Sequence, residues 1–85
     1  MTNLAVLEKR SCLSAFEAAR FATLAETARA NSDGSEDALA DAWDNLREEA
    51  RVCYVAADHG DFDLYMSEVY EILVTEWNAY GEEAA

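Results

Sequence analysis

The chain contains no proline, and its three glycines stand at positions 34, 60 and 81. Because proline and glycine most strongly interrupt regular structure, their scarcity favours long uninterrupted helices. Gly34 lies in the polar cluster NSDGS and Gly60 in the polar cluster ADHGD, and both clusters are typical of turns. We therefore predict three helical segments, over residues 3–30, 36–58 and 62–80.

The two turn clusters also contain residues suited to the ends of helices. Gly34 suits a left-handed backbone conformation, and the next residue, Ser35, is placed as an N-cap. Gly60 is placed as a helix terminator and Asp61 as the cap of the following helix. A chain of 85 residues supports one modest core. We expect one all-α domain, residues 1–85, built as a small bundle of three antiparallel helices.

The middle segment has the clearest amphipathic pattern. Its apolar residues recur in steps of three and four and fall on one narrow arc of a helix: Leu39, Trp43, Leu46, Ala50, Cys53 and Ala57. The opposite side carries a row of acids: Asp37, Asp41, Asp44 and Glu48. An alternative for the end of this segment is a strand starting within residues 51–56, RVCYVA, because valine and tyrosine favour sheets.

The first segment has a broad apolar face, which includes Val6, Leu13, Phe21, Leu24 and Ala28. Two charged residues, Arg10 and Glu17, intrude on that face, which is unfavourable for one straight helix. Ser14 and Glu17 match the capping-box pattern that begins a helix. A break of the first helix near Ser14 is therefore one expectation, and it would give four helices rather than three.

The third segment is apolar around most of its circumference. Its main stripe is large enough for a small core: Phe62, Met66, Val69, Leu73, Trp77 and Tyr80. Such a helix is either central to the bundle or partly covered by another chain, so a homodimer through this helix is an alternative to a central position. Trp43 and Trp77 lie on apolar faces and are expected in the core, whereas Tyr70 is expected to be partly exposed.

The acids are unevenly distributed along the chain. Eighteen acids and six bases give a formal net charge of −12. Residues 32–85 hold fifteen of the acids and two of the bases, and no base follows Arg51. This balance disfavours direct binding to nucleic acid or to an anionic membrane, and it favours partners rich in lysine and arginine.

The N-terminal sequence MTNLAVLEKR is charged by its eighth residue, and no apolar run is long enough for a signal peptide or a membrane span. We therefore expect a cytoplasmic protein, in which Cys12 and Cys53 are reduced. Neither cysteine stands in a CxxC pair or at a zinc-ligand spacing. Both are interpreted as small core hydrophobes.

The acidic row of the middle segment has two interpretations. Like charges four residues apart repel by a few tenths of a kcal/mol per pair, so the row is either a solvated face or a docking surface for a basic groove. A solvated face normally mixes both signs, and the absence of bases after residue 51 favours docking. The predicted contact residues are Asp37, Asp41, Asp44, Glu48, Asp58, Asp61, Asp63, Glu68, Tyr70 and Glu71.

Catalytic and metal sites are poorly supported by the sequence. His59 is the only histidine and is interpreted as a polar cap at a helix end. A calcium loop counted from Asp61 fails, because its fifth and twelfth positions are Tyr65 and Ile72. No phosphate-binding glycine loop and no GxSxG motif is present. We expect no cofactor, no metal site and no enzymatic activity.

In its short length, its acidic helix row at residues 37–48 and its lack of an enzyme motif, the chain resembles small phage-encoded anti-defence proteins. These include anti-CRISPR proteins and DNA-mimicking restriction inhibitors. The stretch SAFEAARF at residues 14–21 resembles helical anti-CRISPR sequences. The resemblance implies steric and electrostatic occlusion of a DNA entry site on a defence complex in the host cytoplasm.

Two main hypotheses follow. The leading one is a non-enzymatic inhibitor that binds a basic nucleic-acid-handling protein, such as a CRISPR effector subunit, through the acidic faces of the second and third helices. The alternative is a helical interaction module, adaptor-like or antitoxin-like, which binds mainly through the apolar surface of the third helix. A small metal-dependent enzyme using Asp58, His59 and Asp61 is a third and weaker hypothesis.

Overall fold

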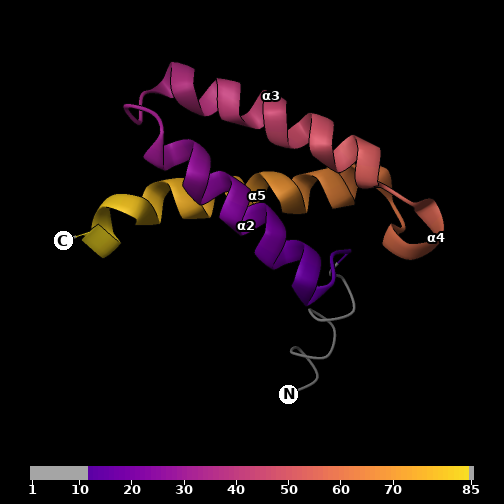
Figure 1. Cartoon of the computed structure of the whole chain (residues 1–85). Helices are drawn as coiled ribbons and strands as arrows, with labels where there is room; N and C mark the ends of the chain where they lie inside the picture. The colour runs from indigo at the N-terminus through magenta and orange to yellow at the C-terminus, as the bar shows by residue number, and fades with distance from the viewer. Residues whose placement is uncertain (1–11, 85) are drawn as a thin grey trace.

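The computed structural model describes residues 12–84, with side chains over residues 12–80. Four helices lie within these residues, and no strand does: α2 (Ala15–Ala30), α3 (Glu36–Cys53), α4 (Ala56–His59) and α5 (Phe62–Ala84). The three long helices reverse direction from one to the next, and α2 crosses α5 (Figure 1). The predicted all-α bundle is confirmed. The part of the first predicted helix over residues 3–11 lies outside the described residues.

Helix α2 begins at a complete capping box. The hydroxyl of Ser14 accepts the backbone N–H of Glu17 at 3.1 Å, and the Glu17 carboxylate accepts the backbone N–H of Ser14 at 3.0 Å. Two N–H groups that lack partners inside the helix are thereby satisfied. The predicted break near Ser14 is confirmed.

The turn between α2 and α3 also follows its sequence pattern. Gly34 has a φ of 77°, a left-handed value, and the Ser35 hydroxyl accepts the backbone N–H of Ala38 at 3.2 Å. The Asp33 carboxylate accepts the backbone N–H of Ser35 at 2.9 Å, and this hydrogen bond lowers the pKa of Asp33. Short polar side chains therefore define both the end of the turn and the start of α3.

Helix α3 ends at Cys53, five residues before the predicted end at position 58. Tyr54 and Val55 adopt extended backbone conformations, and α4 then forms one short helical turn. The predicted strand alternative is also wrong, because these two extended residues belong to no strand. The extended backbone brings the Tyr54 ring within 5.0 Å of the Phe62 ring and 5.1 Å of the Tyr65 ring, measured between centroids. This aromatic packing outweighs the local helical pattern.

Helix α5 begins after Asp61, whose carboxylate accepts the backbone N–H of Leu64 at 3.1 Å, and it continues to Ala84. The predicted end at position 80 is therefore wrong. Gly81 remains helical, whereas Gly34 and Gly60 have positive φ values. A glycine inside a helix costs only about 1 kcal/mol, which its helix-forming neighbours can offset. No helix of the described part of the chain is long and apolar enough to cross a membrane.

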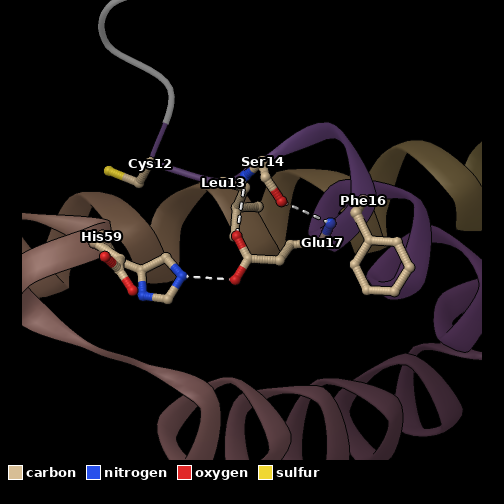
Figure 2. A pocket seen from close by; sticks show the side chains of 7 residues that line it. Cys12, Leu13, Ser14, Phe16, Glu17 and His59 are labelled. Atoms are coloured by element: carbon tan, nitrogen blue, oxygen red, sulfur yellow. Dashed lines mark hydrogen bonds and ion pairs between the residues drawn. The ribbon is translucent and has the colours of Figure 1, made fainter.

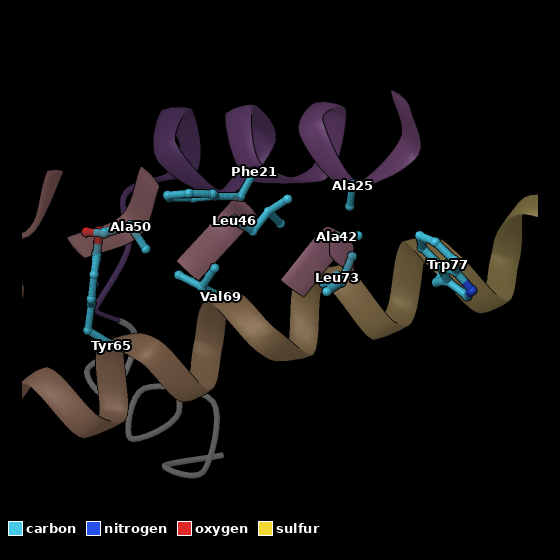
Figure 3. Packing of buried hydrophobic residues seen from close by; sticks show 9 residues of the cluster. All are labelled: Phe21, Ala25, Ala42, Leu46, Ala50, Tyr65, Val69, Leu73 and Trp77. Atoms are coloured by element: carbon cyan, nitrogen blue, oxygen red, sulfur yellow. The ribbon is translucent and has the colours of Figure 1, made fainter. Parts of the chain in front are cut away.

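The core lies between the three long helices (Figure 3). It consists of Phe21, Ala25, Ala42, Leu46, Ala50, Tyr65, Val69, Leu73 and Trp77. The prediction for Trp77 is confirmed, whereas Trp43 packs half-buried at the edge of the core. The predicted apolar arc of α3 is displaced toward Ala42, and Ala57 is exposed because α3 has already ended. Alanines at three core positions let the helix backbones approach closely.

Candidate functional site

The four acids of the predicted row are all exposed on α3: Asp37, Asp41, Asp44 and Glu48. They lie opposite the buried Ala42, Leu46 and Ala50, as the helical period requires. Two of them form ion pairs with arginines of the same helix, Asp44 with Arg47 at 3.2 Å and Glu48 with Arg51 at 3.4 Å. Negative charge on α3 is therefore least compensated in its first half.

The acids beyond α3 occupy several elements. Asp58 is exposed on α4, Asp61 caps α5, and Asp63 and Glu71 are exposed on α5. Glu68 differs from them, because both of its carboxylate oxygens lie 2.9 Å from the backbone nitrogen of Cys12. Glu68 is half-buried and holds the segment before α2 against α5. Its carboxylate is therefore less accessible to a partner than the exposed acids are.

An open hollow of about 550 Å³ lies where α3 meets α5. It is lined by Trp43, Met66, Ser67, Tyr70 and Glu71. The Trp43 and Tyr70 rings meet edge to face, with centroids 5.0 Å apart and planes inclined at 78°. Tyr70 is 45% exposed, which confirms the prediction for this residue. Two aromatic rings from different helices and one carboxylate thus share an accessible site.

A second hollow, of about 520 Å³, lies at the start of α2 (Figure 2). It is lined by Cys12, Leu13, Ser14, Phe16, Glu17, Asp58 and His59. His59 is only 5% exposed, and its Nε2 lies 2.7 Å from Oε2 of Glu17. Its Nδ1 accepts the backbone N–H of Val55 at 2.9 Å. The sequence interpretation of His59 as a helix cap holds for this bond with Val55, but it missed the burial and the Glu17 partner.

The hydrogen bonds of the second hollow determine whether Glu17 or His59 carries the shared proton. The backbone N–H of Ser14 and the bond with His59 lower the pKa of Glu17, so Glu17 is ionised at neutral pH and can only accept. Nε2 of His59 must therefore carry the proton in the shared bond. Burial, together with the nearby Glu68 carboxylate, raises the pKa of the Cys12 thiol. A thiol of raised pKa is a weak nucleophile, so the arrangement of Cys12, Glu17 and His59 is poorly suited to catalysis.

Each arginine of the described residues contacts an acid or an aromatic ring. Arg20 of α2 lies 2.5 Å from Glu49 of α3, and Nη1 of Arg20 donates to the Cys53 thiol at 3.6 Å. Cys53 is half-buried beside this ion pair, so its predicted core position is wrong; Cys12 packs against the core edge. Arg29 lies over two rings of α5, with its Cζ 5.7 Å from the Trp77 centroid and 4.8 Å from the Tyr80 centroid.

Within the described residues, no group of three or more acidic, histidine or cysteine side chains is arranged to hold a metal ion. The hypothesis of a metal-dependent enzyme at Asp58, His59 and Asp61 has no geometric support there. The imidazole of His59 already has partners on both nitrogens. Asp61 is engaged at the start of α5.

No protein-family model, no curated protein and no solved structure matches this chain. The resemblance to small anti-defence proteins therefore stays a prediction.

Proposed function

We propose that this protein is a non-enzymatic binding protein that occupies the nucleic-acid site of a basic protein or complex. The contact surface is formed by the acidic faces of α3 and α5. One observation carries the proposal: exposed acids occupy two helices that pack together and share the Trp43–Tyr70 hollow. The resemblance implies a CRISPR effector subunit or a related bacterial defence protein as the partner.

The spacing of the acids supports a partner that normally binds phosphates. Residues one helical turn apart are separated by about 5.4 Å along the axis, whereas a DNA duplex carries one charge per about 1.7 Å. One helix is therefore too sparse to imitate a duplex, and two neighbouring acidic helices come closer. Asp37 and Asp41 on α3 and Asp63 and Glu71 on α5 have no ion-pair partner among the described side chains, so they are available to lysines and arginines.

A binding role is also favoured by the second hollow. The pKa of its Cys12 thiol is raised above the ordinary value, and its histidine is engaged on both ring nitrogens. These side chains stabilise the junction of α2 and α4 rather than present a free acid, base or nucleophile. The acidic surface, in contrast, remains open to a partner.

A second candidate function is an interaction module that binds through apolar surface. The observation in its favour is the exposure of large apolar side chains, above all Phe16 at 79% and Val52 at 76%. Helix α5 contributes less exposed apolar surface than its sequence suggests, because Val69, Leu73 and Trp77 are buried inside the bundle. Its exposed apolar residues are Phe62, Leu64 and Tyr70. This module would hold its partner with little dependence on salt.

The test is affinity capture from a nuclease-treated bacterial lysate, followed by elution with rising salt and competition with duplex DNA. The double variant Asp41→Asn/Glu71→Gln is compared with Glu82→Gln/Glu83→Gln, which removes the same charge near the C-terminus. We expect the unmodified protein to capture a nucleic-acid-binding protein, and duplex DNA should displace it. The first double variant should capture this partner at least fivefold less efficiently than the second. A partner retained at high salt and captured equally by both variants would instead support the apolar module.

A further inference from the structure

Arg29 shows how this fold holds a guanidinium group. The group lies over Trp77 and Tyr80 of α5, and its charge contributes to the lowered pKa of the nearby Asp33. Two aromatic rings, of a tryptophan and a tyrosine, thus hold one arginine, and the charge of this arginine acts on a carboxylate nearby. This combination is favourable because the aromatic faces attract a cation and a nearby carboxylate adds electrostatic attraction.

The hollow between α3 and α5 has the same three groups in Trp43, Tyr70 and Glu71. Among the described residues, Arg29 is the cation that lies over aromatic rings, and its rings are Trp77 and Tyr80. The other described arginines are engaged elsewhere: Arg20 with Glu49, Arg47 with Asp44, and Arg51 with Glu48. The described part of the chain therefore supplies no guanidinium to the rings of this hollow.

We propose that the hollow receives an arginine side chain of the partner protein. The guanidinium stacks on the exposed Tyr70 ring beside Trp43 and donates hydrogen bonds to the Glu71 carboxylate. This inference rests on the proposed function and names the group that the acidic surface recognises most strongly. Charge complementarity selects a cation, and the two rings select arginine over lysine, because a planar guanidinium stacks on aromatic faces. Arginine, tyrosine and tryptophan are also the residues that most often dominate interface energies.

The two tryptophans make the site observable by nuclear magnetic resonance, because each gives one indole N–H signal. Nona-arginine and nona-lysine, two peptides of equal charge, are titrated into the labelled protein at 150 mM salt. We expect the Trp43 signal to move with nona-arginine and much less with nona-lysine, and the affinity for nona-arginine to be at least threefold higher. The signal of Trp77 should stay in place, because this side chain is buried and already covered by Arg29.

Variants separate this site from general electrostatic attraction. Tyr70→Leu keeps the charge and most of the apolar bulk but removes the ring, so the preference for nona-arginine should disappear. Phe16→Leu, at an exposed aromatic residue of α2, is the matched control and should keep the preference. Equal binding of both peptides by the unmodified protein, with an unmoved Trp43 signal, would overturn the arginine site while leaving acidic docking intact. Failure of both peptides to bind at low salt would contradict the proposed function as well.

Discussion

Nε2 of His59 lies 2.7 Å from Oε2 of Glu17, a residue 42 positions earlier in the chain. The same glutamate closes the capping box at the start of α2, and the same histidine accepts the N–H of Val55 at the start of α4. One hydrogen bond, between a buried histidine and a half-buried glutamate, therefore joins the ends of two helices. It explains why a charged residue occurs on the apolar face of α2.

We predict that Glu17 and His59 stabilise the fold cooperatively. His59→Ala removes one partner of the Glu17 carboxylate and the acceptor of the Val55 N–H. We expect a loss of about 2–3 kcal/mol in the free energy of unfolding. Glu17→Gln should cost less, and the double variant should show a coupling of about 1 kcal/mol. The measurement is urea denaturation, with Asp58→Asn at an exposed neighbouring position as the control. Strictly additive effects would show that the bond contributes nothing of its own.

Stability should depend on pH through Glu17. Its pKa is lowered from the ordinary value of 4.5, so the ionised carboxylate stabilises the folded state above that pH. This contribution is lost as the pH falls through the lower, folded-state pKa. Protonation of other acids relieves repulsion in the whole protein. The informative quantity is therefore the difference in the free energy of unfolding between the unmodified protein and Glu17→Gln. We expect the difference to be full at pH 7 and to shrink below pH 4.5. A difference that persists unchanged at pH 3 would contradict this assignment.

We predict that the Tyr65 hydroxyl stabilises the end of α3. It donates to the backbone carbonyl of Ala50 at 2.8 Å, and both residues are buried (Figure 3). The Tyr54 N–H that would reach this carbonyl in a continuing helix donates instead to Arg51. Tyr65→Phe leaves the Ala50 carbonyl buried and unpaired, so we expect a loss of about 1–2 kcal/mol in chemical denaturation.

Alkaline titration gives a second readout for the buried Tyr65 hydroxyl. Burial raises the pKa of Tyr65 to about 12, so the neutral phenol stabilises the fold fully below pH 10. That contribution is lost as the pH rises through 12. Tyr70→Phe, at an exposed tyrosine, is the control and should leave stability nearly unchanged. Equal stability of the Tyr65→Phe variant and the unmodified protein would show that another group satisfies the Ala50 carbonyl.

Gly60 is predicted to be intolerant of any other residue. Its φ of 74° and ψ of −131° lie outside the left-handed helical region, near backbone space that glycine alone occupies readily. No atom would lie within 4 Å of an added Cβ, so the cost is conformational rather than steric crowding. We expect Gly60→Ala and Gly60→Asn to lose about 1–3 kcal/mol each in thermal or urea denaturation. Rescue by asparagine would indicate a left-handed helical conformation instead.

The starts of the helices were predictable because their signals are local. Ser14, Ser35 and Asp61 each accept a backbone N–H three residues ahead, so four residues of sequence contain the whole interaction. The exposure of the acidic row on α3 was predictable for a similar reason, because a helical period assigns each residue to a face. The ends of α3 and α5 were not predictable in this way.

By itself, the sequence determined an all-α chain with caps, turns at two glycines and an acidic outer face on α3. Only the tertiary structure decided that α3 ends at Cys53, where the Tyr54 ring packs against residues of α5. It also decided that Trp43 and Tyr70 form one hollow, and that Glu17 meets His59. Periodicity assigns a residue to one side of its own helix, whereas the neighbour it meets depends on how separate helices cross and pack.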